Sequence, residues 1–367
     1  MLIGAGAVAL IAMQAPPPQP SPTAVIRPVA GDARLVVWEA GAVSCNGAQI
    51  RPVDLVRRPA TLTRTVSREL PAQTIAFSID AEGRARSIRR AGNGFAPDSD
   101  RAVAALAASR FSAGSERNGC TLTYTAHDEP VEEAELAELA GYLALREGPP
   151  LPGAAFDRLR QGDGCRNDTV FQTIVAVYPD GRSLSLLPGR VEWTSLRFDV
   201  SAAGEPMNPV VEASSGSAEV DQATISALRQ SRLAVSAPTT GCRMSFRHRT
   251  GVLPAPARSD DEPAAPKDCP ANDAWTVPLV RQFPRAFQSR QIEGWARVQF
   301  DVAPWGAIGN ITVVEAQPAE DFGIAARAML ARGRVGAGSG ATGCVATIAY
   351  RMEGSTPPDP AESDAAS

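Results

Sequence analysis

The sequence is poor in the residues that most often carry catalysis and metal binding. It contains only two histidines, and Lys267 is the single lysine among 36 basic residues in a chain of 367. Metal sites usually need Cys or His residues two to four positions apart, and no such cluster occurs. A P-loop, a GxSxG motif and an HExxH motif are also missing. We therefore expect no enzymatic activity, no metal and no cofactor.

The chain also lacks a strongly basic character and an apolar run long enough to cross a membrane. Its net charge is −4, whereas a nucleic-acid-binding protein usually carries a basic patch and a positive net charge. The apolar run at residues 2–13 is shorter than the roughly twenty residues that a bilayer-spanning helix needs. Followed by small residues and PPPQPSP, it is typical of a secretory signal peptide. We expect an exported protein without a stable membrane span, whose leader is a cleaved signal peptide or a short anchor.

Four landmarks recur in step three times along the chain. A Phe lies six residues before a Gly, and an Arg follows the next helical pattern. One Cys lies ten residues after that Arg, and another Cys lies 31 to 33 residues before the Phe. Such regularity indicates an internal repeat. The downstream landmarks are Phe77, Gly83, Arg110 and Cys120; Phe198, Gly204, Arg232 and Cys242; and Phe300, Gly306, Arg334 and Cys344.

Each repeat has the same pattern of expected elements. An alternating strand leads through a Gly-bearing turn into a second strand, which is a hairpin signal. A helical pattern of about a dozen residues follows, and a last strand begins at the second cysteine. We therefore predict α+β structure with three tandem units. The expected order is a leader at 1–22, repeat 1 at 30–128, a helical and Pro-rich linker at 129–157, repeat 2 at 158–250, a Pro-rich linker at 251–267, repeat 3 at 268–353 and a disordered tail at 354–367.

The repeat also predicts how the six cysteines pair. Six cysteines allow fifteen connectivities, and the repeat selects the one in which each unit closes its own disulfide. Closing loops of this length stabilises a fold by roughly 4–5 kcal/mol in the chain-entropy model, and it requires an oxidising compartment. The alternative is a cytosolic protein with buried, reduced cysteines. The predicted pairs are Cys45–Cys120, Cys165–Cys242 and Cys269–Cys344.

Repeat 3 resembles the carboxy-terminal domain of the TonB family of energy transducers. The resemblance covers residues 283–330, and repeats 1 and 2 share it only through the Phe, Gly and helix landmarks. All three repeats lack the aromatic-rich segment that is common in the family at the end of the helix. The matching features are Phe283-Pro284 before a helix, Ile292-Glu293-Gly294 before the first strand, Phe300-Asp301-Val302 with the turn at Gly306, and Val313 to Ala316 followed by Pro318.

The resemblance implies a small antiparallel sheet of about three strands, with helices on one face, in each repeat. It also implies a periplasmic location and a protein partner, such as an outer-membrane TonB-dependent transporter. In the family the last strand pairs with an extended segment of that transporter, a mode called β-augmentation. The partner-binding residues implied on the last strands are Leu122 and Tyr124 in repeat 1, Met244 and Phe246 in repeat 2, and Ala346, Ile348 and Tyr350 in repeat 3.

We therefore expect an exported periplasmic protein-interaction protein that binds an extended peptide or an envelope protein by strand addition. Two alternatives stay open at this point. One is a TonB-type energy transducer for outer-membrane transport, whose membrane anchor lies in an upstream extension of the chain. The other is a structural envelope protein that binds no peptide.

Overall fold

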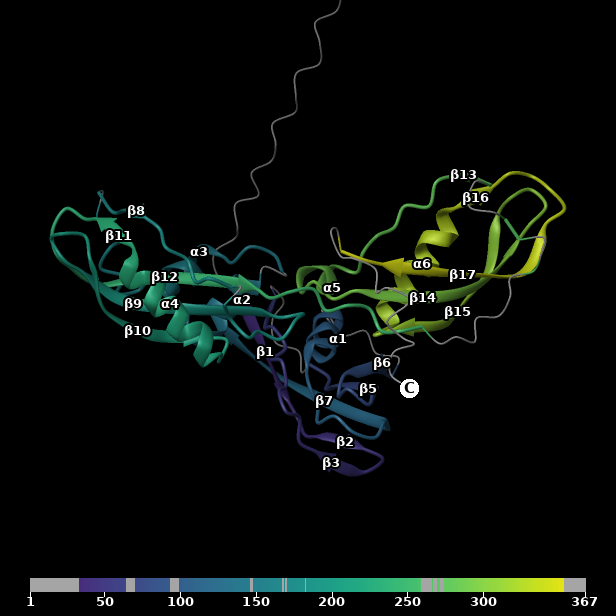
Figure 1. The fold of residues 1–367 in the computed structure, drawn as a ribbon, viewed down its shortest axis with the longest axis horizontal. Coiled ribbons are helices and arrows are strands. Elements are labelled where there is room, and N and C mark those ends of the chain that lie inside the picture. The colour runs from purple at the N-terminus through teal and green to yellow at the C-terminus, as the bar shows by residue number, and fades with distance from the viewer. Residues whose placement is uncertain are drawn as a thin grey trace, which may run out of the picture.

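The computed structural model describes residues 33–63, 70–92, 99–145, 148–166, 168, 170–181, 183–258, 266, 269–270 and 274–352. The predicted leader at 1–22 and the predicted tail at 354–367 lie outside these ranges. The described chain mixes α-helices with antiparallel sheets, as the α+β prediction requires. Repeats 2 and 3 form two arms, and repeat 1 lies between and below them in Figure 1.

Repeat 1 forms a sheet of seven strands that is larger than predicted. Its last strand is central, because it pairs with one strand on one side and with two strands on the other. The first strand of the repeat also pairs with a further short strand. The hairpin that precedes the helix forms one edge of this sheet. The elements are β1 (Arg34–Ala40), β2 (Val43–Cys45), β3 (Ala48–Ile50), β4 (Thr61–Thr63), β5 (Gln73–Ile79), β6 (Ala85–Ala91), α1 (Ser99–Ala108) and β7 (Arg117–Pro130).

Repeat 2 and the linker before it contain five strands and three helices. The main sheet has the order β10-β9-β12, and a short second sheet joins β8 to β11. The elements are α2 (Leu136–Leu145), α3 (Gly153–Leu159), β8 (Gln172–Val175), β9 (Val191–Val200), β10 (Pro206–Ser214), α4 (Ala218–Gln230), β11 (Arg232–Ala234) and β12 (Thr239–Arg249).

Repeat 3 has the same layout as repeat 2, with one additional short helix. Its main sheet has the order β15-β14-β17, and β13 pairs with β16. The longer helix packs on the two hairpin strands. The elements are β13 (Trp275–Val277), α5 (Arg285–Ser289), β14 (Gly294–Val302), β15 (Ile308–Gln317), α6 (Glu320–Arg332), β16 (Arg334–Val335) and β17 (Ala341–Tyr350).

The turn glycine of the landmark pattern has the same environment in all three repeats. At Gly306, φ is +83° and a Cβ atom would lie 2.0 Å from the carbonyl oxygen of Val335. Only glycine combines a positive φ with so close a backbone approach. The carbonyl of Gly306 in turn accepts a hydrogen bond from the amide of Val335 at 3.0 Å. Gly83 and Gly204 make the matching contacts with Phe111 and Leu233.

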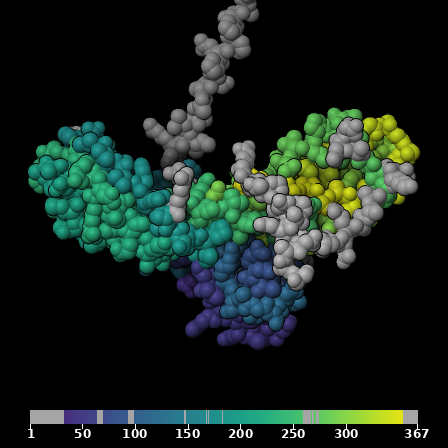
Figure 2. All heavy atoms as spheres, in the orientation of Figure 1, coloured from purple at the N-terminus to yellow at the C-terminus, as the bar shows by residue number. Residues whose placement is uncertain are grey.

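The apolar cores do not follow the three repeats one by one. Repeats 1 and 3 share a continuous core, in which Phe77 and Leu106 belong to the same cluster as Phe322 and Ile348. Repeat 2 has a core of its own around Phe198 and other buried residues of its sheet and helix. Figure 2 shows repeat 2 as a lobe at one end of the molecule, and its core is separate from the one that joins repeats 1 and 3.

A polar contact holds repeat 1 against repeat 3. Arg90 on β6 donates to both carboxylate oxygens of Asp321, at 2.8 and 3.2 Å, and to Glu320 at 2.7 Å. Beside it, the amide of Ile88 donates to the carbonyl of Pro318 at 2.9 Å. The edge strand of repeat 1 is thus occupied by the chain segment that leaves β15.

The predicted linkers pack closely against the repeats, whereas Pro-rich spacers usually keep modules apart. In the first linker, α2 approaches repeat 2 so closely that a Cβ atom on Gly141 would lie 3.2 Å from the Trp193 ring. In the second, the carbonyl of Pro256 accepts a hydrogen bond from Trp295 Nε1 at 2.9 Å. Leu253 in that linker pairs with Ile292 beside the first strand of repeat 3.

Candidate functional site

The candidate site is the outer edge of the last strand in repeats 2 and 3. In the described part of the chain, β12 pairs only with β9 and β17 pairs only with β14, so both strands lie at a sheet edge. An edge strand presents backbone N–H and C=O groups that can pair with another chain. In Figure 1 the two strands run toward the middle of the molecule from its opposite ends.

The prediction of a partner-binding edge in repeat 1 is wrong. β7 lies inside its sheet, with β5 on one side and with β1 and β2 on the other. Leu122 is paired with Ile75 of β5, and Tyr124 is paired with both Gln73 and Ala40. Two strands, β1 and β2, have no counterpart beside β12 or β17 in the described chain, and they cover the edge that the last strand of repeat 1 would otherwise leave at the surface.

The predicted side chains in the other repeats point toward the core. Ile348 is 8% exposed and Tyr350 is fully buried, while Ala346 is half-buried on the same face. In repeat 2, Met244 and Phe246 are half-buried. These residues lie an even number of positions after the disulfide cysteine of their strand, so their side chains share its face. The side chain of that cysteine points inward. A partner strand would therefore meet the backbone of the edge rather than the buried side chains of Ile348 and Tyr350.

Hydrogen bonds at the two ends of β12 show which backbone groups face outward. The amide of Arg243 points away from β9 and donates to a carboxylate oxygen of Asp163 at 3.3 Å. The amide of Thr250 points the other way and donates to the carbonyl of Arg190 at 3.2 Å. Direction alternates along an antiparallel strand, so the odd-numbered residues face the outer edge. Beyond Arg243 these are Ser245, Arg247 and Arg249.

The same register holds in repeat 3. Cys344 pairs with Phe300 as Cys242 pairs with Phe198, so Val345 corresponds to Arg243. The amide of Met352 supports this assignment, because it donates inward to Glu293 at 2.8 Å. The residues whose backbone groups face the outer edge of β17 are Val345, Thr347 and Ala349.

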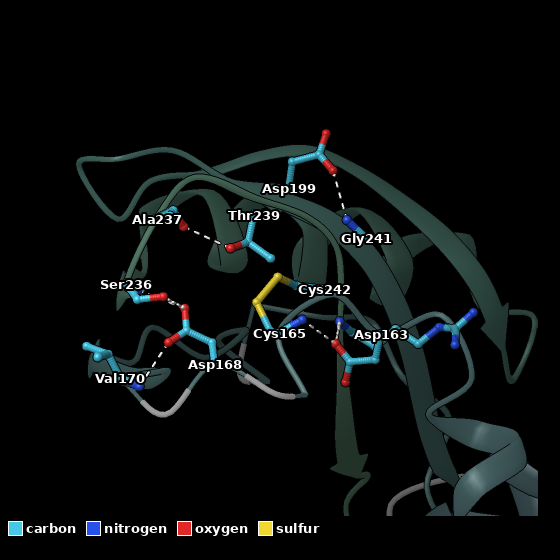
Figure 3. The surroundings of a disulfide bond; sticks show 11 residues. Asp163, Cys165, Asp168, Val170, Asp199, Ser236, Ala237, Thr239, Gly241 and Cys242 are labelled. Carbon is cyan, nitrogen blue, oxygen red and sulfur yellow. Dashed lines mark hydrogen bonds between the residues drawn. A yellow bond between two sulfur atoms is a disulfide. The ribbon is translucent and has the colours of Figure 1, made fainter.

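Each last strand is tied to its own repeat by a disulfide near its start. The predicted connectivity is confirmed, with Cα–Cα distances of 3.8, 4.9 and 5.5 Å in repeats 1, 2 and 3. Figure 3 shows the bond of repeat 2, where Cys165 belongs to the loop that begins at Asp163. The carboxylate of Asp163 also accepts from the amide of Cys165 at 3.1 Å. The disulfide therefore fixes the start of β12 beside this loop.

A carboxylate on the first strand also holds the start of the last strand in repeats 2 and 3. Asp301 accepts hydrogen bonds from Asn310 Nδ2 at 2.7 Å and from the amide of Gly343 at 2.8 Å. These two hydrogen bonds hold the pKa of the Asp301 carboxyl below its usual value. Asn208 and the amide of Gly241 lower the pKa of Asp199 in the same way. The Asp and Gly interaction of repeat 2 is drawn in Figure 3.

We expect the Asp301→Asn substitution to destabilise repeat 3 in a pH-dependent manner. The folded-state pKa of Asp301 is depressed, so its contribution is present above the unfolded-state pKa of about 3.9 and is lost as pH falls below it. Urea unfolding between pH 2 and pH 7 should show a difference between wild type and variant that shrinks below about pH 4. In repeat 1 the same position is Ser78, so Ser78→Ala is the control and should show no such pH dependence. A pH-independent difference for Asp301→Asn would contradict the assignment.

The outward-facing residues and the Asp–Asn pair were not predicted from the sequence. Parity relative to the paired cysteine would have separated the two faces, because a cysteine in an intra-repeat disulfide must point inward. A second signal was the residue ten positions after the landmark Phe, which is Asn208 in repeat 2 and Asn310 in repeat 3. Both asparagines have positive φ, near +50°, which is a conformation that asparagine tolerates better than most residues.

The described residues contain neither a metal-ligand cluster nor a helix suited to cross a membrane. No group of three or more His, Cys, Asp or Glu residues there is arranged to hold a metal ion. Among the helices of these ranges, none combines the length and the apolar character that crossing a bilayer requires.

Comparison with known proteins finds similarity over part of the chain. No family model matches it. Protein TonB of Klebsiella pneumoniae is 39% identical over 72 residues, which are 20% of this chain and 30% of that protein. Protein TonB of Escherichia coli K12 is 33% identical over 75 residues, covering 20% and 31%. Protein TonB of Salmonella typhimurium LT2 is 33% identical over 105 residues, covering 27% and 43%. The chain thus contains a segment like the TonB carboxy-terminal domain and spans less than half of these relatives.

Proposed function

We propose that this chain is an exported, non-enzymatic protein-interaction protein built from three copies of a TonB-like module. It works in the periplasm and binds an extended segment of an envelope protein, which is added as a strand to the outer edge of β17. The partner that the TonB resemblance suggests is an outer-membrane transporter with an extended segment facing the periplasm. Three intra-repeat disulfides support export, because such bonds persist in oxidising compartments.

The observation that carries the proposal is the position of β17 at the edge of its sheet. β17 is ten residues long and has β14 as its neighbour on one side only within the described chain. Its ends are anchored independently of a partner, by the Cys269–Cys344 disulfide at one end and by the buried Tyr350 at the other. A preorganised edge reduces the ordering cost of binding. An incoming strand would then gain main-chain hydrogen bonds along the edge.

The side chains beside this edge fit an uncharged segment. β17 contains no charged residue between Ala341 and Tyr350. The outer face of the strand presents Val345 and Ala349, both half-buried. Specificity in strand addition comes from alternate side chains, so small and apolar neighbours favour a partner segment of small or β-branched residues.

We expect the Ala349→Pro substitution to weaken binding of a transporter's extended segment at least about tenfold, since it deletes an outward N–H worth about 1 kcal/mol and adds a steric conflict at the edge. Because the amide of Ala349 faces away from β14, the ladder inside the repeat stays intact. Fluorescence anisotropy with the labelled segment as a synthetic peptide measures the affinity of the full-length, oxidised chain.

Ala349→Val is the matched control, because it changes the side chain and keeps the N–H. It should bind within about twofold of wild type. Equal affinity of Ala349→Pro and Ala349→Val would contradict strand addition at β17. A peptide that does not bind the wild-type chain at all would contradict the proposed function itself.

A further inference from the structure

We infer that β12 of repeat 2 is a second strand-accepting edge, which takes an extended segment alternating between acidic and apolar residues. The inference rests on the binding mode of the proposed function but concerns a different repeat and a different ligand chemistry. β12 and β17 have the same register against their neighbours. They differ in charge and in what covers their inner faces, and these differences define the partner.

The part of β12 that an incoming strand could use is well defined. At its start, the carbonyl of Gly241 accepts from the amide of Gly164 at 3.2 Å, and Arg243 donates to Asp163. The loop at 162–164 therefore occupies the edge up to Arg243. From Ser245 to Arg249, no further strand lies beside β12 among the described residues. Five extended residues span about 17 Å, which is enough for a short recognition segment.

The outer face of β12 is basic. The outward positions of the strand include Arg243, Arg247 and Arg249, His248 lies on the inner face, and the strand contains no acidic residue. Arg243 is neutralised, because its guanidinium binds both carboxylate oxygens of Glu212 at 2.5 and 2.7 Å. Arg249 is exposed at the far end of the strand, and Arg197 is exposed on the neighbouring strand β9. Opposite charges at cross-strand positions stabilise a sheet and like charges destabilise it, so this face favours carboxylates.

The inner face of β12 offers an apolar shelf that β17 lacks. Phe246 is half-buried, and the Tyr178 ring, 72% exposed, lies 6.2 Å from it in an edge-to-face arrangement. In repeat 3 the residue at the register position of Phe246 is Ile348, which is buried at 8% exposure. Side chains of an added strand alternate between the two faces. Those beside Phe246 and Tyr178 would be apolar, and those beside Arg249 would be acidic.

The charge pattern also argues against a second copy of this chain as the occupant. Pairing β12 with β12 of another copy would place Arg247 and Arg249 of one strand beside basic residues of the other. Like charges across a strand pair are unfavourable. The complementary occupant is therefore an acidic, alternating segment of a different protein.

The test compares two capped seven-residue peptides, one alternating Glu with Val and one alternating Lys with Val, on the full-length oxidised chain. At low salt we expect the acidic peptide to bind at least about tenfold more tightly, and the preference to decrease at 0.5 M salt because exposed charges are screened. Ser245→Pro should abolish acidic-peptide binding, whereas Ser245→Thr should preserve it. Arg249→Glu should weaken it about fivefold, and Arg249→Gln should have a smaller effect.

Several outcomes would overturn the inference. These are equal affinity for the two peptides, unchanged binding to a correctly folded Ser245→Pro variant, or loss of acidic-peptide binding in Ala349→Pro. If Ser245→Pro does not fold, N-methylation of alternate peptide residues replaces it, and equal binding of the two methylated forms would contradict strand pairing. Transporter-segment binding that persists at β17 while the acidic peptide fails would overturn only this inference and leave the proposed function standing.

Discussion

Replacing Cys269 and Cys344 together with alanine is expected to lower the free energy of unfolding of repeat 3 by about 4–5 kcal/mol, the chain-entropy value for a loop of this length. The cysteines are 75 residues apart, so the disulfide removes a large part of the freedom of the unfolded chain. Hydrogen exchange in a denaturant series, read by mass spectrometry on peptides from β14 and β17, measures the change in this repeat directly.

The matched variant replaces Cys165 and Cys242, which are 77 residues apart in repeat 2. Because repeat 2 has its own core, this variant should destabilise β9 and β12 and leave β14 and β17 unchanged. Equal destabilisation of both repeats by either variant would contradict the separation of the cores. No effect of either variant would contradict a stabilising role of the disulfides.

The Arg90→Gln substitution is expected to cost about 3 kcal/mol of stability in the joined body of repeats 1 and 3, since it leaves the carboxylate of Asp321 buried without its main cation. The estimate is at the low end for a buried pair because the Arg90 side chain is 27% exposed. Urea unfolding, monitored by hydrogen exchange of peptides from α1 and α6, measures the loss of stability. A variant as stable as wild type would contradict the interface between these repeats.

The pH dependence of this variant follows from the pKa of Asp321. Burial raises that pKa in the folded protein, although the Arg90 guanidinium opposes the shift. For a raised pKa, the contribution to stability is present below the unfolded-state pKa and is lost as pH rises through the folded-state pKa. Without Arg90 the pKa should rise further, so the deficit should be largest near neutral pH and smaller in acid. The double variant Arg90→Gln with Asp321→Asn should recover most of the neutral-pH loss.

The features that could be predicted from sequence are those that short-range landmarks determine. The spacing of Phe300, Gly306 and Cys344 recurs twice upstream, and it predicted the hairpin, the helix and the disulfide pairing. The turn glycine illustrates why, because the conformation at Gly306 excludes every side chain and so fixes the residue. The landmarks Phe198 and Cys242 of repeat 2 also lie opposite each other, paired across β9 and β12.

The features that could not be predicted depend on contacts between distant segments. No local pattern shows that residues 34–45 return to cover β7, because such pairing depends on tertiary packing. The shared core of repeats 1 and 3 has the same origin, and so does the contact of Arg90 with Asp321. The burial of Ile348 and Tyr350, which were predicted as contact residues, has a different reason. In a strand with one buried face, the apolar side chains point into the core. A partner strand at the edge pairs with the backbone of that strand instead.

The most direct test of strand addition at β17 is amide hydrogen exchange by NMR, with and without the transporter's extended segment. The account predicts that the peptide slows exchange at Val345, Thr347 and Ala349, whose amides face outward, and leaves Ala346 and Ile348 nearly unchanged because they already pair with β14. Protection that is absent from the outward amides, or that falls equally on both sets, would contradict it.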